Sequence, residues 1–123
     1  MASVVDALRR YAFTLPGAYE DHPWGESVAK VDKKVFAFFG VPTDDRYTGF
    51  TVKLPESCAA ALALHFTEPT RYGLGKAGWV TVRPPDDWPV DLFRDWIDES
   101  YRAVAPKRRL RQTASAADGG SRG

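Results

Sequence analysis

The chain has little cysteine and little histidine, and it lacks a long apolar run. Its 123 residues include one cysteine, Cys58, which excludes an intramolecular disulfide and fits the reducing cytoplasm. No apolar segment approaches the ~20 residues that a membrane span requires. Residues 1–6 also lack the basic start and unbroken apolar stretch of a signal peptide. These absences predict a cytoplasmic protein without a membrane segment.

The chain also lacks an excess of charge of either sign, since 17 basic and 16 acidic residues leave a net charge of +1. The distribution is uneven: residues 107–123 hold five basic residues and one acid, and residues 1–106 hold 12 basic and 15 acidic residues. Binding to nucleic acid phosphates needs clustered Lys and Arg. We therefore divide the chain into a mildly acidic folded domain, residues 1–106, and a basic tail, residues 107–123, which lacks periodicity from Gln112 onward and is predicted to be disordered.

Three segments have the apolar spacing of amphipathic helices. The first begins after Ser3, a suitable N-cap, and ends at Pro16-Gly17. The second starts at Pro55 and continues through the alanine-rich run 59–64. The third follows Pro89, and its buried stripe should comprise Phe93, Trp96, Ile97, Ser100, Tyr101 and Val104.

Five segments have the pattern of half-buried strands: residues 27–31, 34–39, 47–53, 71–74 and 79–83. Asp32-Lys33 joins the first two as a hairpin turn, and a glycine-rich turn joins the last two. Residues 20–25 are predicted to be a loop. The element order is αβββαββα, and its short strand connections indicate an antiparallel sheet. We expect an α+β fold, a two-layer sandwich of a five-stranded antiparallel sheet and three helices.

Short motifs along the chain resemble those of a known family in order and spacing. They are Leu15-Pro16-Gly17, Trp24-Gly25, Gly78-Trp79-Val80 and the run Tyr-Arg-Ala-Val-Ala-Pro-Lys at residues 101–107. Over roughly residues 4–110 the chain is similar to the MmcQ/YjbR family. This resemblance implies a compact fold of the CyaY-like or type-III-secretion-chaperone-like kind. It also implies a DNA-binding role in which β-hairpins act as paired wings.

The chain departs from that family at one motif. Many members have Asn-Lys-x-His-Trp before the last strand, and residues 75–79 here read Gly-Lys-Ala-Gly-Trp. Lys76 and Trp79 are kept, whereas the Asn and the His are absent. A polar site that depends on that His is therefore not expected in this protein.

Motifs for cofactors and catalysis are weak. Residues 73–78 match Gly-x-Gly-x-x-Gly, but a strand pattern follows where a helix N-terminus would have to hold the pyrophosphate. His22, His65 and Cys58 lack the spacing of a metal site. Ser27 lacks the second glycine of a nucleophile elbow. We therefore predict a hairpin tip at 73–78 and expect no cofactor, no metal and no catalytic residue.

Basic residues gather at the two predicted hairpins and in the tail. The candidate nucleic-acid-binding residues are Lys30, Lys33, Lys34, Arg71, Lys76, Lys107, Arg108, Arg109 and Arg111. Ordinary solvated turns are the alternative explanation for the hairpin lysines. Trp24, Trp79 and Arg83 are candidates for a surface groove, although tryptophans at such positions also pack in cores.

The leading hypothesis is a non-enzymatic protein that binds DNA weakly as a monomer or homodimer. Two alternatives stay open. One is a protein-interaction module with an apolar groove beside Trp24 or Trp79. The other is a small-molecule site between the sheet and the helices.

Overall fold

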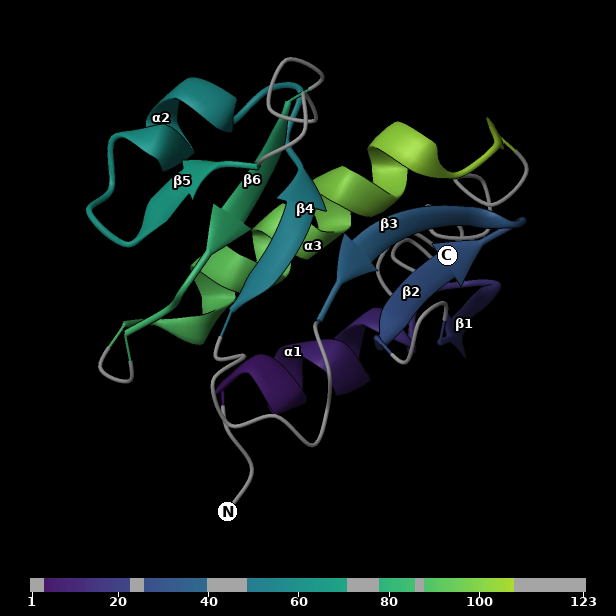
Figure 1. Cartoon of the computed structure of the whole chain (residues 1–123). Helices are drawn as coiled ribbons and strands as arrows, with labels where there is room; N and C mark the ends of the chain where they lie inside the picture. Colours follow the sequence, from purple (N-terminus) through teal and green to yellow (C-terminus); the bar gives the residue numbers. More distant parts are fainter. Residues whose placement is uncertain (1–3, 23–25, 40–48, 71–77, 86–87, 108–123) are drawn as a thin grey trace, which may run out of the picture.

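The structure, a computed structural model, describes residues 4–22, 26–39, 49–70, 78–85 and 88–107 (Figure 1). The elements follow the order αββββαββα along the chain. They are α1 (Val4–Ala12), β1 (Ala18–Asp21), β2 (Val28–Val31), β3 (Lys34–Phe38), β4 (Phe50–Lys53), α2 (Cys58–Leu62), β5 (Thr67–Pro69), β6 (Trp79–Val82) and α3 (Val90–Val104).

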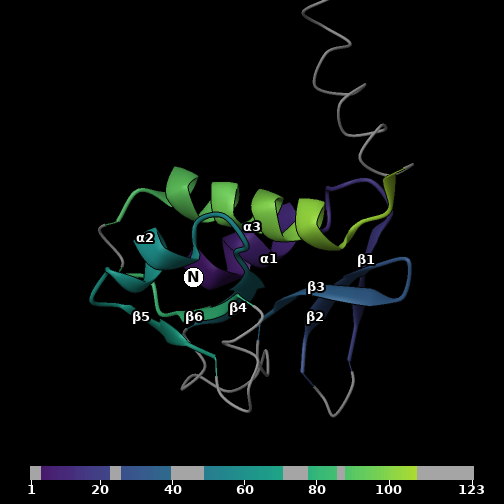
Figure 2. The same cartoon turned by 90° about the horizontal axis from the view of Figure 1, so that it is seen from above.

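The strands form one antiparallel sheet in the order β1-β2-β3-β4-β6-β5. The helices lie on one face of this sheet, as Figure 2 shows from the side. The predicted two-layer α+β architecture is therefore confirmed, but the described residues form six strands where five were predicted. Two of these strands, β5 and β1, were not predicted, and β1 includes residues 20 and 21 of the predicted loop. Its polar sequence has little alternation because β1 is an edge strand with a largely exposed side.

Several predicted boundaries differ from the observed ones. Helix α1 ends at Ala12, earlier than the predicted stop at Pro16-Gly17. Helix α2 begins at Cys58, three residues after Pro55. The predicted strand at 71–74 lies outside the described residues. In the described part, the outer partner of β6 is β5, where the sequence indicated only a helix break at Pro69. Proline is tolerated there because β5 is an edge strand.

A β-bulge bends strand β3 against strand β2. Ala29 pairs with Ala37 and Lys30 pairs with Val35, so Phe36 is an extra residue on β3. Phe36 and Ala37 are both fully buried. The bulge therefore places two successive side chains of β3 in the core.

Helix α3 compensates for this irregularity through Ser100. The Ser100 hydroxyl donates to the carbonyl oxygen of Phe36 on β3. The Ser100 hydroxyl oxygen in turn accepts the backbone N–H of Lys53 on β4 at 2.8 Å. The described β3–β4 pairing comprises residues 37–38 and 51–52, so Ser100 connects the two strands just beyond it. A buried backbone N–H and a buried carbonyl are thereby satisfied.

The hydrophobic core lies between the sheet and the helices. The predicted stripe of α3 is confirmed for Phe93, Trp96, Ile97, Ser100 and Tyr101, which are buried, whereas Val104 is only partly buried. Tyr101 packs edge-to-face on Phe36, with ring centroids 5.4 Å apart. Within the described residues, no helix is long and apolar enough to cross a membrane.

The opposite face of the sheet carries no helix among the described elements, and Figure 1 looks onto it. Since Phe50, Val52, Val80 and Val82 point into the core, their strand neighbours point the other way. The residues in the middle of this open face are Phe38, Thr51, Lys53, Trp79 and Thr81.

Candidate nucleic-acid interface

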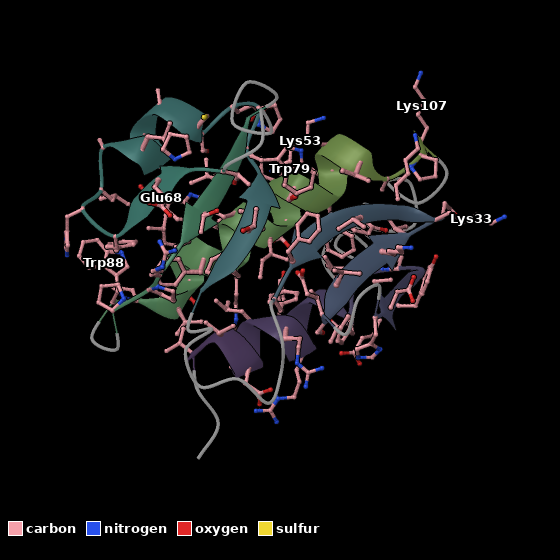
Figure 3. All side chains as sticks on the ribbon, viewed as in Figure 1. Lys33, Lys53, Glu68, Trp79, Trp88 and Lys107 are labelled. Carbon is pink, nitrogen blue, oxygen red and sulfur yellow. The ribbon has the colours of Figure 1, made fainter. Side chains whose placement is uncertain are left out.

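The β2–β3 hairpin presents two exposed lysines at its tip. Asp32 and Lys33 form the two-residue turn and have φ values of 47° and 70°, both left-handed. Such a turn matches the twist of the paired strands, which confirms the predicted hairpin. Lys33 and Lys34 are exposed, and Figure 3 shows the Lys33 side chain extending away from the sheet.

The C-terminal end of α3 lies at the same end of the molecule as this hairpin tip (Figures 1 and 2). Tyr101 holds the helix there, since its ring contacts Phe36 and its hydroxyl donates to the Pro16 carbonyl at 2.6 Å. Lys107 follows the helix and is exposed. We refer to Lys33, Lys34 and Lys107 as the basic end.

Two of the predicted basic residues are neutralised by acids. The Lys30 ammonium lies 2.7 Å from the Asp21 carboxylate across the β1–β2 pair. Their hydrogen bond raises the pKa of Lys30 and lowers that of Asp21. The Arg83 guanidinium lies 2.9 Å from the Glu68 carboxylate. Lys30 and Arg83 therefore contribute less positive potential than the sequence suggested.

The remaining predicted basic residues and one tryptophan lie outside the described residues. They are Arg71, Lys76, Arg108, Arg109, Arg111 and Trp24. The second predicted basic wing and a Trp24–Trp79 groove thus stay predictions.

Trp79 is partly buried and lies on the open face near its centre. Its ring packs against Phe38, with ring centroids 5.5 Å apart. Lys53 is its cross-strand partner on β4, and Figure 3 shows both side chains in the same part of the face. The aromatic ring of Trp79 therefore has the cationic residue Lys53 as a neighbour on the open face.

A row of threonine hydroxyls lies beside these rings. The Thr81 hydroxyl is 3.2 Å from that of Thr51 and 3.1 Å from that of Thr70. The row crosses β4 and β6 and continues just past the end of β5. The centre of the open face is thus polar and aromatic, without the continuous aliphatic surface of a packed layer.

The sequence interpretation missed a hydrogen-bonded cluster around Glu20 on β1. One Glu20 oxygen accepts from the Ser27 hydroxyl at 2.5 Å and from Arg9 at 2.8 Å, and His22 Nε2 lies 3.3 Å away. Desolvation alone would raise the pKa of Glu20, but the hydrogen bond from Ser27 and the charge of Arg9 lower it overall. The cluster ties edge strand β1 to helix α1. No sequence spacing indicates it, because β1 was not predicted.

The sequence also gave no signal for the role of Glu99, which lies on α3 and is buried. Its carboxylate accepts the backbone N–H groups of Glu56 and Ser57, each at 2.9 Å, and the Ser57 hydroxyl at 2.6 Å. Desolvation raises the pKa of Glu99, but these hydrogen bonds outweigh it and lower the pKa overall. Glu99 thus caps the start of the α2 region from a neighbouring helix.

Residues typical of metal or nucleophilic sites do not converge in the described structure. Cys58 is partly buried and is not in a disulfide. Among the described residues, no group of three His, Cys, Asp or Glu side chains is placed to hold a metal ion. The features that stand out chemically are the basic end and the aromatic centre of the open face.

These features define a small two-layer α+β domain with one helix-covered sheet face and one open face. The YjbR family model matches residues 13–103, and the chain belongs to the YjbR family. The resemblance seen in the sequence is therefore confirmed.

Two solved structures are similar to this chain. A crystal structure of a Deinococcus radiodurans protein, with family-model domain DUF419, is 28% identical, with a TM-score of 0.66 over 82% of this chain and 77% of that chain. A crystal structure of a Pseudomonas syringae protein is 19% identical, with a TM-score of 0.61 over 80% of this chain and 96% of that chain. The second likeness concerns the fold alone. No curated protein matches this chain.

Proposed function

We propose that this protein is a non-enzymatic DNA-binding protein that contacts phosphates at its basic end. One observation carries the proposal. A hairpin tip and the chain after α3, about 70 residues apart in the sequence, present exposed lysines at the same end of the molecule (Figure 3). Clustered cations of this kind release counterions from nucleic acid and so favour binding.

The charge pairing elsewhere in the structure supports this choice of surface. Arg9, Arg10, Lys30, Arg83 and Arg94 each lie within ion-pair distance of an acid. Within the described residues, Lys33, Lys34 and Lys107 form no ion pair. Among the described residues, the lysines of the basic end therefore carry charge that no ion pair offsets, although Asp32 lies next to Lys33 in the turn. The sequence continues from this end with Arg108, Arg109 and Arg111.

The turn conformation adds a second argument. A left-handed conformation costs an L-residue about 1–2 kcal/mol, and glycine avoids this cost. The chain nevertheless has lysine at position 33, where φ is 70°. A positive charge at the tip offers a reason for a residue that local stability disfavours.

We expect weak binding, because residues 1–106 carry a net negative charge. The test is fluorescence anisotropy of a labelled duplex of about 20 base pairs over a salt series, with the full chain and a chain ending at Pro106. The key variant is Lys33→Ala/Lys34→Ala. Arg10→Ala/Arg94→Ala is the matched control, because it removes the same charge from exposed positions on the helix side.

If the proposal is right, the lysine variant reduces the slope of log affinity against log salt by about 2, since each phosphate contact contributes roughly 0.9. The control should change the slope less. The chain ending at Pro106 should bind more weakly but keep its dependence on the two hairpin lysines. Equal losses in both double variants would contradict the proposal, and so would binding that requires only the tail.

A further inference from the structure

The open face differs chemically from the rest of the described surface. Two cations on it are paired, Lys30 with Asp21 and Arg83 with Glu68. Lys53 forms no ion pair within the described residues. It lies between these two neutral pairs in the strand order and opposite Trp79. In the part of the chain that the structure describes, the centre of the face therefore offers a cation without an ion-pair partner beside an aromatic pair.

The aromatic pair is accessible from solvent. Phe38 and Trp79 are partly buried, and neither lies under a described helix. Their edge-to-face contact fixes the two rings at 66°, and the backbone of Lys53 is held by Ser100. The two rings and the backbone of Lys53 are thus held in place by the fold, an arrangement that lowers the entropic cost of binding.

These groups correspond to the parts of a single-stranded nucleic acid. Unpaired bases stack on aromatic side chains, and a nearby cation contacts the phosphate. The hydroxyls of Thr51, Thr81 and Thr70 can donate to or accept from base edges. A duplex keeps its bases stacked internally and has no base to place on Trp79.

The face is also continuous with the basic end. Strand β3 runs from Lys34 at the hairpin to Phe38 on the open face. Four residue steps of a strand span about 13 Å, a length that a few nucleotides cover. A single nucleic acid strand can therefore contact the basic end and the aromatic centre at the same time.

We infer that the open face binds a single-stranded nucleic acid segment, with a base stacked on Trp79 and a phosphate on Lys53. This inference rests on the nucleic-acid binding of the proposed function, to which the basic end would add neighbouring phosphate contacts. It assigns base contact to Trp79 and salt-dependent attraction chiefly to the lysines.

The test uses the full chain and anisotropy of labelled oligothymidine and oligouridine of about ten nucleotides, with a labelled duplex of similar length as a third probe. The variant is Trp79→Leu, which keeps apolar volume and removes stacking. The matched control is Trp88→Leu. Trp88 is also partly buried but packs against Phe66 near α2 and β5 (Figure 3). Thermal melting of both variants verifies that they fold.

We expect Trp79→Leu to weaken single-strand binding by roughly 5- to 150-fold, the loss typical of one stacked base. The affinity of Trp79→Leu for the duplex should change less than about 2-fold, because no base is stacked there. The affinity of Trp88→Leu for single strands should also change less than about 2-fold. The oligouridine arm shows whether RNA is accepted equally. An unchanged single-strand affinity in Trp79→Leu, or an equal loss on the duplex, would overturn the inference.

The lysine variant distinguishes this inference from the proposed function. If Lys33→Ala/Lys34→Ala weakens all probes and Trp79→Leu weakens none, the basic end stands and the open-face site is refuted. If only Trp79→Leu weakens binding, and only the binding of single strands, the open-face site stands and the basic end is refuted. Absence of binding by the wild-type chain at low salt would refute both.

Discussion

The two faces of the sheet are built on different principles. On the covered face, side chains such as Phe50, Val52, Val80 and Val82 are almost fully buried under the helices. On the open face, the alternate residues of the same strands are threonines, a lysine and a partly buried tryptophan. The period of two in β4 and β6 thus separates the residues that hold the fold from those available for contact.

The two faces also differ in what their polar groups do. Polar groups on the covered side, Glu99 and Ser100, complete hydrogen bonds of the fold itself. Polar groups on the open face either pair with each other, as the threonines do, or stay unpaired within the described residues, as Lys53 does. Removal of a covered-face residue should therefore reduce stability, and removal of an open-face residue should reduce binding.

The largest expected effect on stability is that of Trp96→Ala. Trp96 is only 5% exposed and packs against Phe93 on the covered side. Its truncation should lower the free energy of unfolding by about 3–5 kcal/mol. Chemical denaturation monitored by circular dichroism measures this loss. The open-face variant Trp79→Leu should lose much less, and equal losses would mean that the two faces do not differ as described.

A smaller loss is expected for Glu99→Gln, because the variant removes the charge that accepts three hydrogen bonds at the start of the α2 region. We expect a loss of about 1–3 kcal/mol at neutral pH. Denaturation at several pH values tests the charge. Glu56→Gln is the control, since the Glu56 side chain is exposed and only its backbone N–H contacts Glu99.

The pH dependence has a definite sign. The pKa of Glu99 in the folded protein lies below its ordinary value of 4.5. Its contribution is therefore fully present above about pH 4.5 and is lost as the pH falls through the folded-state pKa. The stability difference between wild type and Glu99→Gln should shrink in acid. A difference that is constant from neutral pH down to about pH 3 would show that the charge of Glu99 does not stabilise the fold.

The smallest effect is expected for Lys33→Gly, and it has the opposite sign. Glycine accepts the left-handed turn conformation without strain, so the free energy of unfolding should rise by about 0.5–1 kcal/mol. Duplex affinity should fall at the same time because one charge of the basic end is lost. If both the free energy of unfolding and the duplex affinity rise in Lys33→Gly, the charge of Lys33 does not contribute to DNA binding.

Much of the fold was predictable because alternation and helical spacing depend on local burial. Strands β4 and β6 and helix α3 bury one regular side. These elements and strands β2 and β3 were predicted with small boundary differences. Strand β1 was missed because its sequence, Ala-Tyr-Glu-Asp, has no buried alternate residue. The bulge at Phe36 was also invisible, since it appears only when the register of two strands is known.

The candidate site was predictable in its residue types more than in its pairings. Lys33, Lys34 and Lys107 were predicted from charge clustering. That Lys30 and Arg83 are neutralised depends on Asp21 and Glu68, which come close only through the cross-strand register. The role of Glu99 depends on the docking of α3 against residues 56–57. No local pattern in the sequence encodes such contacts.

The most direct test is the salt dependence of oligothymidine binding by wild type, Lys33→Ala/Lys34→Ala and Trp79→Leu. If the basic end contacts phosphates and the open face stacks a base, the lysine variant lowers the salt slope. The Trp79→Leu variant then lowers the affinity at every salt concentration and leaves the slope unchanged. If both variants lower the slope alike, or if neither changes the binding, this division of roles between the basic end and the open face is wrong.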